Sequence, residues 1–409
     1  MATIPSLALI PSGYKASKVY SVLPTDGTGD FTFTRSGSAT RVNSEGLIEL
    51  VSTNVPRLNY PLIDGVVQGC PSLLLEPQRI NLVQYSEDFS NAYWTKSGSS
   101  VVSGFTSPDG TANAFKLVED TSTGEHKINP TIVTSNIYTI SVFAKYNGRI
   151  LQLASTSTGG HYANFDLLNG VIGNFGVTTE NVTITEISNG WYRCSMTTTS
   201  NMNTAIVNTV QSVTSVYQES YTGDGTSGVY IWGAQLEAGS YATSYIPNFG
   251  TALGATRSAE TCNNAGDVNT FNDSEGVLFA EISALADDGT FRNISLNNGT
   301  TAQTVRIYYR NTTNQITTLI GSASGGSATI NLANAYTFNK IAVAYQNDNA
   351  KVFVNGVLEA TIAGITMPTG LNQLDFDVAG ALPFYGNCKD LQVFTTALTD
   401  AELIALTTI

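Results

Sequence analysis

The sequence predicts an all-β fold, with an irregular β-rich N-terminal segment followed by two β-sandwich domains of the jelly-roll type. Three observations lead to this fold class. The chain of 409 residues is 42% hydrophobic, so it is long enough for two or three cores. It contains 37 glycines together with many β-branched and aromatic residues, which favours short strands joined by turns. Its apolar residues recur in runs of period two, and turn residues separate these runs.

Residues 1–80 are predicted to form short strands, at 30–35 and 47–51, between turns that contain Gly, Asn and Pro. A segment of this length buries too little surface to be stable alone, so we expect neighbouring copies or a host surface to stabilise it. The segment holds six basic and six acidic residues, whereas the rest of the chain accounts for the whole net charge of −13. We therefore predict that residues 1–80 attach the protein to another protein.

Residues 81–250 are predicted to form the first sandwich. Residues 137–144 alternate with period two, as in a strand with two distinct faces. Residues 181–198 alternate in the same way on both sides of Asn189 and Gly190, a pair that supplies the positive φ angles of a tight hairpin turn. Repeated strands with turn signals at this spacing indicate a sandwich or jelly roll.

Residues 251–275 are polar and contain glycine, so they are interpreted as a linker. Residues 276–409 are predicted to form the second sandwich, and the Asn-Gly pair at 355–356, between two apolar runs, predicts one of its hairpins. Near the end of the chain, Thr399 and Glu402 have the spacing of a capping box ahead of an apolar run. They predict one short helix in an otherwise all-β chain.

Groups that carry enzymatic chemistry are scarce. The chain has two histidines, His126 and His161, only 12% of its residues are charged, and no Gly-x-Ser-x-Gly elbow occurs. We therefore predict that the protein is not an enzyme. The alternative is a polysaccharide depolymerase, for which Asp375 and Asp377, on one face of a strand, are the best local pair of carboxylates. A solvated or calcium-binding face is the competing interpretation, because the acidic pattern expected on the catalytic strand of sandwich glucanases is missing.

No cofactor is predicted. The four cysteines lie far apart and form no Cys-x-x-Cys pair, which excludes the usual metal-ligand spacing and favours scattered buried thiols. A structural calcium ion is left open, since the acidic and carbonyl oxygens of the loops at 107–110, 119–121 and 287–289 are of the type that calcium prefers. Ordinary turn chemistry explains each of these loops equally well.

Charge and hydropathy also limit the partners. The net charge of −13 repels phosphate backbones and anionic lipids, so we expect no nucleic-acid partner. No run of about 20 apolar residues occurs, so no membrane insertion is predicted. Pro5 and Pro11 interrupt the one apolar run near the N-terminus, and we therefore expect no signal peptide.

Exposed aromatic rings that stack on pyranose faces are the side chains that would bind surface glycans. Aromatic residues near predicted loops are candidates for such contacts, although packing or a subunit contact is the competing interpretation of each. The candidates are Trp94, Tyr162, Tyr217, Tyr221 and Tyr385. Trp191 and Trp232 are instead predicted to lie in the core, because they alternate in phase with aliphatic neighbours.

Three stretches of the chain together resemble virion proteins of tailed bacteriophages. They read IPSGYK with FTFTRSGSATRVN, PSLLLEPQRINL with YSEDF, and WGAQLEAG with YIP. As a set they are similar to the attachment segment and the carbohydrate-binding-like jelly roll of phage head-fibre and tail-fibre proteins. The resemblance implies a homotrimer that is bound through residues 1–80 to a capsid or tail protein. It also implies assembly in the host cytoplasm and a final location in the virion.

The C-terminal part resembles a laminin-G or concanavalin-like lectin domain, through VFVNGV at 352–357 and LTDAEL at 398–403. This second resemblance implies a sandwich and suggests binding to glycans or proteins. We therefore predict a structural and adhesive virion appendage, a head or tail fibre that displays glycan-binding-like sandwiches. The alternatives are a polysaccharide depolymerase of a phage tail and a capsid decoration protein that binds no ligand.

Overall fold

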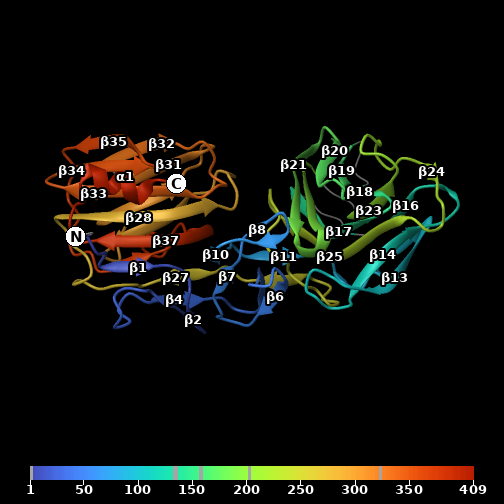
Figure 1. Ribbon diagram of the computed structural model, residues 1–409, viewed down its shortest axis with the longest axis horizontal. Helices are drawn as coiled ribbons and strands as arrows, with labels where there is room; N and C mark the ends of the chain where they lie inside the picture. The colour runs from blue at the N-terminus through green and yellow to red at the C-terminus, as the bar shows by residue number, and fades with distance from the viewer. Residues whose placement is uncertain (1–2, 131, 133–136, 156–159, 201–203, 322–324) are drawn as a thin grey trace.

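The computed structural model describes residues 3–130, 132, 137–155, 160–200, 204–321 and 325–409. Within these residues almost all of the regular secondary structure is β-strand, and the chain forms two sandwiches that lie end to end with short ribbons between them (Figure 1). The predicted all-β fold class is therefore confirmed. In the part of the chain that is described, no helix is long and apolar enough to cross a membrane.

The first sandwich consists of two antiparallel sheets of six strands each. One sheet contains, in spatial order, β12 (Thr95–Ser97), β16 (His126–Asn129), β23 (Ile206–Val210), β18 (Ile150–Ala154), β19 (Tyr162–Asp166) and β20 (Val171–Phe175). The other contains β13 (Ser99–Phe105), β14 (Ala114–Glu119), β25 (Gly228–Ala238), β17 (Tyr138–Asn147), β22 (Trp191–Thr198) and β21 (Thr179–Ile187). A two-stranded ribbon of β15 (Thr123–Gly124) and β24 (Tyr221–Thr222) completes this module.

Strand β17 shows why this sandwich buries both faces of one sheet. Ile140 and Val142 lie in the core between the two sheets, whereas Phe143 points the other way and packs with Trp191 and Trp232 in a second apolar cluster. The two tryptophans are 2% and 1% exposed, which confirms that they are core residues. Side chains of the N-terminal segment pack on this second cluster. The outer face of the sheet is therefore directed at the rest of the protein.

The second sandwich packs a sheet of eight strands against a sheet of five. The larger sheet contains β35 (Val357–Ala363), β34 (Asn349–Val354), β33 (Asn339–Gln346), β28 (Glu275–Ala284), β37 (Gly386–Phe394), β10 (Ser72–Leu75) and β7 (Arg57–Asn59), with β1 (Leu7–Leu9) also paired to β37. The smaller sheet contains β32 (Ser327–Asn331), β31 (Gln315–Ile320), β30 (Thr304–Tyr309), β29 (Arg292–Asn297) and β36 (Gln373–Asp375).

The N-terminal segment is part of this second sandwich. Both β1 and β10 pair with β37, a strand more than 300 residues further along the chain. A small sheet joins β4 (Phe31–Thr34) to β27 (Thr261–Asn263) and also contains β2 (Tyr14–Lys15) and β3 (Lys18–Val19). The segment is thus stabilised by distant strands of its own chain, whereas we expected neighbouring copies or a host surface to do this. The period of a short strand does not identify its partner, which explains the difference.

The first sandwich is an insertion into the chain of the second. β11 (Arg79–Asn81), which precedes it, pairs antiparallel with β26 (Ala255–Arg257), which follows it. The residues that we interpreted as a linker, 251–275, therefore contain the strands β26 and β27 and the buried residues Arg257 and Glu260. Their polar character reflects buried ion pairs and not an exposed connection.

The predicted hairpin turns are present. Asn189 and Gly190 have φ angles of 62° and 75° in the short 3₁₀ turn η1 (Ser188–Gly190), and Asn355 and Gly356 have φ angles of 51° and 85°. These left-handed conformations suit Asn and Gly, and they match the twist of the flanking strands. Two further ribbons, β5 (Ala39–Val42) with β6 (Ile48–Val51) and β8 (Leu62–Ile63) with β9 (Val66–Val67), lie between the sandwiches (Figure 1).

The predicted helix is α1 (Asp400–Thr407), the one α-helix among the described residues. Its capping box is complete, because the Thr399 hydroxyl accepts from the Glu402 N–H and the Glu402 carboxylate accepts from the Thr399 N–H. Leu403 packs with Phe279 and other buried side chains of the eight-stranded sheet. The helix therefore covers the outer face of that sheet.

One carboxylate in the same sheet makes stability depend on pH. Asp390 on β37 lies opposite Glu281 on β28. Burial, and after it the charge of Glu281, raises the pKa of Asp390 to about 6. Because this value is above the unfolded value of about 3.9, the folded protein loses stability as the pH rises from about 4 to about 6, and the loss persists at neutral pH.

We expect Asp390→Asn to remove this loss, because the amide carries no charge to bury. The free energy of unfolding should rise by about 1–2 kcal/mol at pH 7, with little change at pH 3.5. Urea denaturation of both proteins at the two pH values measures the difference. A gain of equal size at both pH values would contradict the titration and point to a packing effect.

Candidate functional site

A network of buried ion pairs joins the segments of the chain that precede and follow the first sandwich. Glu260 pairs with Arg35 at 2.8 Å and with Arg57. Glu76 pairs with Arg57 at 2.7 Å and with Arg257 at 2.8 Å. All five side chains are at most 3% exposed. Although burial acts to raise it, the charges of Arg257 and Arg57 hold the pKa of Glu76 below its ordinary value. The network therefore ties the N-terminal strands to the segment that follows the first sandwich.

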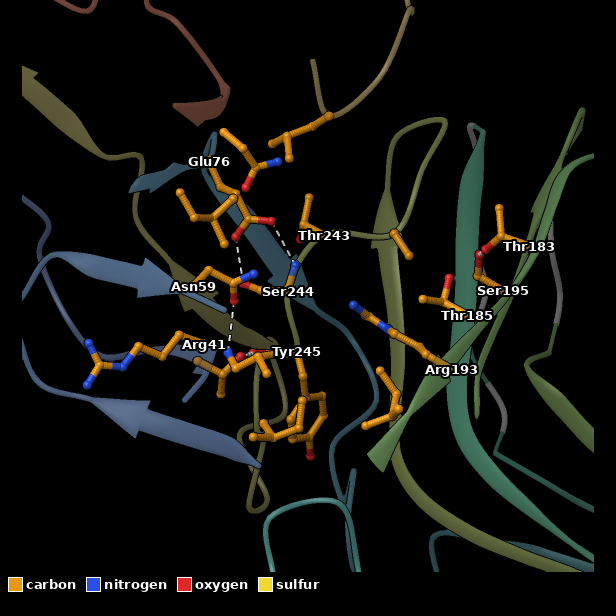
Figure 2. Close-up of a pocket in the computed structure, with 18 of the residues that line it drawn as sticks. Arg41, Asn59, Glu76, Thr183, Thr185, Arg193, Ser195, Thr243, Ser244 and Tyr245 are labelled. Carbon is orange, nitrogen blue, oxygen red and sulfur yellow. Dashed lines mark hydrogen bonds between the residues drawn. The ribbon is translucent and has the colours of Figure 1, made fainter. Parts of the chain in front are cut away.

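An open cleft of about 550 Å³ lies beside this network, between the two sandwiches (Figure 2). The strands β21 and β22 form its wall on the first sandwich, and residues 284–285 with Tyr336 form its wall on the second. Most of the side chains that line it are polar. They include Arg41, Asn59, Glu76, Thr183, Thr185, Arg193, Ser195, Thr243, Ser244 and Tyr245.

Arg193 is the cation of this cleft. It extends from β22 into the cavity, whereas Arg41 directs its guanidinium away from it (Figure 2) and pairs with Glu49. The Nη2 atom of Arg193 donates to the Ser141 hydroxyl at 3.1 Å, and its guanidinium lies 5.2 Å from the centre of the Phe143 ring. Its buried Nε has no hydrogen-bond partner within the part of the chain that the structure describes. Burial lowers the pKa of Arg193, as it does for a charge removed from water without a close counter-ion.

The opposite end of the cleft carries an exposed aromatic ring. Tyr336 is 54% exposed and lines both this cavity and a second hollow of about 500 Å³. The second hollow leads along Thr183 and Ser195, whose hydroxyls lie 2.7 Å apart, to Asp287 and Asp288. Asp288 is paired with an arginine, whereas Asp287 accepts one backbone N–H bond. Ring, hydroxyls and carboxylates thus face the same groove.

Glu76 is the one carboxylate among the labelled residues of the cleft, and it is fully engaged. It accepts from the backbone N–H of Ser244 at 2.8 Å and from the Ser244 hydroxyl at 2.5 Å (Figure 2). Two arginines bind it as well. A carboxylate held in this way is a poor proton acceptor, so Glu76 is suited to recognition and not to general-base catalysis.

The aromatic residues that the sequence singled out do not line this cleft. Trp94 is 1% exposed and its indole N–H donates to the Tyr85 carbonyl, while Tyr221 is 7% exposed and donates to Glu119. Neither ring is free to stack on a sugar, because Trp94 packs in the core of the first sandwich and Tyr221 is buried in β24 against His126. Half-buried Tyr162 and Tyr217 lie together, with ring centres 6.2 Å apart. Tyr385, half-buried as well, directly precedes β37 in the second sandwich.

The pair of acids considered for catalysis is structural. Asp375 is 1% exposed and accepts from the amides of Asn297 and Gln373. Asp377 is 4% exposed and accepts from the amide of Asn263 at 2.6 Å. Neither carboxylate lies on a solvated face, contrary to the competing interpretation. Both instead hold residues 263–264 against the smaller sheet.

The histidines and the acidic loops also have structural partners, and the cysteines are free thiols. His126 and His161 are 0% and 1% exposed, and both ring nitrogens of each lie within hydrogen-bond distance of another residue. Three of the four free cysteines are buried and Cys70 is exposed. In the loops considered for calcium, Asp109 accepts from its own turn and Glu119 pairs with Arg149. Among the described residues, no group of three or more His, Cys, Asp or Glu side chains is placed to hold a metal ion.

Arg193 and Tyr336 were missed from the sequence. Arg193 is the one charged residue of β22, and the alternation of the strand directs its side chain to the face opposite that of buried Cys194. This isolated charge was the one feature of the sequence that could have identified it. Tyr336 precedes β33 in a polar turn and resembles any other loop tyrosine. What brings the two together is the placement of one sandwich beside the other, which no local pattern encodes.

A family model matches part of the second sandwich. Residues 268–404 match the model of the concanavalin A-like lectin/glucanases superfamily, Laminin_G_3. No curated protein matches the chain. Among solved structures, the CBM40 of the Ruminococcus gnavus IT-sialidase bound to α2,3 sialyllactose is 22% identical, with a TM-score of 0.30, over 33% of this chain and 84% of that one.

Two further solved structures are similar over longer stretches at lower identity. Domains LG4-5 of the mouse laminin α1 chain are 10% identical, with a TM-score of 0.23, over 81% of this chain and 96% of that chain. The Trypanosoma rangeli sialidase in complex with the inhibitor DANA is 10% identical, with a TM-score of 0.28, over 96% of this chain and 82% of that chain. These scores are too low to transfer a ligand or an activity to this protein.

Proposed function

We propose that the protein binds glycans in the cleft between its two sandwiches and acts as an adhesive module without catalytic activity. The observation that carries this proposal is the combination, in one open groove, of an exposed tyrosine ring with hydroxyl, amide, carboxylate and guanidinium groups. A sugar offers an apolar ring face and several hydroxyls, so it needs both a flat ring and convergent polar groups. The match of residues 268–404 to a superfamily of lectins and glucanases supports the same conclusion.

The absence of catalysis is part of the proposal. Retaining and inverting glycosidases need two carboxyl groups that face the scissile bond. Glu76 is bound by two arginines and by Ser244, and Asp375 and Asp377 are buried by amides. A protein that holds its acids in this way is better suited to retain a polysaccharide than to cleave it.

Replacement of Tyr336 by alanine tests the location of the site. We expect Tyr336→Ala to weaken binding to the glycans that the wild-type protein recognises on an array by at least about tenfold, or ~1.4 kcal/mol, because the stacking surface is lost. The matched control is Tyr162→Ala, which removes a tyrosine that the sequence suggested and that lies outside the cleft. If Tyr162→Ala abolishes binding and Tyr336→Ala does not, the site lies on the first sandwich and the cleft is the wrong location.

We further propose that this adhesive protein is an appendage of a tailed-bacteriophage virion, a head or tail fibre that assembles as a homotrimer. The three phage-like stretches of the sequence support this role. Since residues 1–80 supply strands to the second sandwich, attachment would use their exposed apolar side chains, among them Ile4, Ile10 and Val22. Gold labelling of the protein on intact particles tests the role: label at a fixed place on head or tail supports it, and unlabelled particles contradict it.

A further inference from the structure

Arg193 carries a charge that the fold does not neutralise. Among the described residues, no carboxylate lies within ion-pair distance of its guanidinium. The two acids whose charges act on Arg193 are Glu237 and Glu76. Both are already paired, Glu237 with Arg79 at 3.7 Å and Glu76 with two arginines. Glu237 also accepts from the N–H and the hydroxyl of Thr243. Both acids are therefore already engaged with other cations and donors.

The surroundings of Arg193 are positive overall, although the chain carries a net charge of −13. The five arginines of this region are Arg35, Arg57, Arg79, Arg193 and Arg257, and the three glutamates that pair with them are Glu76, Glu237 and Glu260. The positive charges of this region therefore exceed the negative ones by two, and Arg193 is the one of these five arginines that lines the cleft. An acidic chain concentrates its cations in this way where an anion is to be bound.

The open positions on Arg193 suit a carboxylate. Its Nη1 makes no hydrogen bond within the described residues and its Nη2 makes one, to Ser141, whereas its Nε is buried. The guanidinium lies 5.2 Å from the centre of the Phe143 ring, and its nitrogen end points into the cavity (Figure 2). A planar guanidinium with a free edge binds a carboxylate through two parallel N–H bonds, and a partly desolvated setting strengthens them.

We infer that the cleft selects acidic saccharides, with the carboxylate of the sugar bound to Arg193 and a sugar ring against Tyr336. This inference rests on the proposed glycan-binding function and adds the class of ligand. Thr183 and Ser195 line the cleft together with both anchors and also line the adjoining hollow with Tyr336. Asp287 repels a second anionic group at the far end of the groove, so one acidic residue flanked by neutral sugars fits better than a polyanion.

An array of neutral, carboxylate-bearing and sulfated oligosaccharides, probed with the full-length protein, tests the selection. We expect carboxylate-bearing members to bind about 10- to 100-fold more tightly than the same oligosaccharides with the carboxylate converted to its methyl ester. Arg193→Gln should remove this difference by weakening binding of the carboxylate-bearing members, and Arg193→Lys should restore part of it. Preference for sulfated members over carboxylates would overturn the assignment of the ligand class.

Arg306→Gln is the matched control. Arg306 on β30 is also half-buried, also has an unpartnered Nε among the described atoms, and lies outside the cleft. Its replacement should leave the preference for carboxylates intact, and a loss there would show that any buried arginine has the same effect. If the protein binds neutral sugars through Tyr336 and shows no preference for carboxylates, this inference is wrong. The proposed function would stand in that case. Silence of the whole array would overturn both.

Discussion

A chain in which Asn81 is joined to Ala255 by a two-residue Asn-Gly turn is expected to fold without the first sandwich. These two residues are direct partners in the β11–β26 ribbon, so a tight hairpin turn closes the gap. The shortened protein keeps residues 1–81 and 255–409, which contain every strand of the second sandwich. We expect a cooperative thermal transition and the near-ultraviolet circular dichroism of a packed core.

The fragment 258–409 is the matched comparison, and it is expected not to fold. It lacks β1, β7 and β10, so β37 loses two partners on one edge. It also loses eight core side chains, namely Leu7, Leu9, Val19, Phe31, Phe33, Leu58, Leu73 and Leu75. At about 1.5–3 kcal/mol for each buried side chain, the loss is about 12–24 kcal/mol, which is as large as or larger than the 5–15 kcal/mol by which typical domains are stable. If the fragment melts like the shortened protein, the N-terminal strands are dispensable.

Local structure was predictable where a few neighbouring residues decide it. Asn189-Gly190 and Asn355-Gly356 form the turns that their φ preferences require, and Thr399 caps the helix as its spacing to Glu402 indicates. The all-β class followed from composition and alternation. The insertion of one sandwich into the other did not, because hydrogen bonding between β1 and β37 leaves no trace in the period of either strand.

The candidate site depends on the same long-range pairing. Trp94 is of a residue type that often stacks on sugars, yet it is buried. Arg193 has the sequence surroundings of an ordinary strand residue, yet it faces a cavity. Whether each side chain can reach a ligand depends on its exposure, and its exposure depends on how the two sandwiches pack. Sequence reasoning therefore identified the kind of site, an aromatic and polar surface for glycans, and placed it on other residues.

The stretches that resemble phage proteins meet in space, which gives them a physical meaning. Arg35 lies in the first stretch, Glu76 in the second, and Glu237 in the third. Arg35 pairs with Glu260, and Glu237 binds Arg79 of the second stretch, beside Glu76. In a buried network of ion pairs, replacement of one side chain leaves its partner as an unpaired charge. The residues of such a network therefore depend on one another for stability. The stretches thus mark the junction between the sandwiches, next to the cleft.

Glu260 should be the most sensitive single residue of this junction. We expect Glu260→Gln to lower the free energy of unfolding by about 3–5 kcal/mol, because it leaves Arg35 and Arg57 as buried charges without a full counter-ion. Urea denaturation measures the loss. Glu49→Gln is the matched control, since it breaks the pair with Arg41 in which Glu49 is 41% exposed, and pairs of that kind contribute at most about 1 kcal/mol.

A double-mutant cycle separates the ion pair from the general effect of a buried substitution. Arg35→Met removes the cation that pairs with Glu260 alone, whereas Arg57 also binds Glu76. If the pair is coupled as the 2.8 Å contact indicates, Arg35→Met should be less harmful in the Glu260→Gln background than in the wild type, by about 0.5–3 kcal/mol. Strictly additive losses would mean that the two side chains contribute separately, and that the junction is held by packing around them.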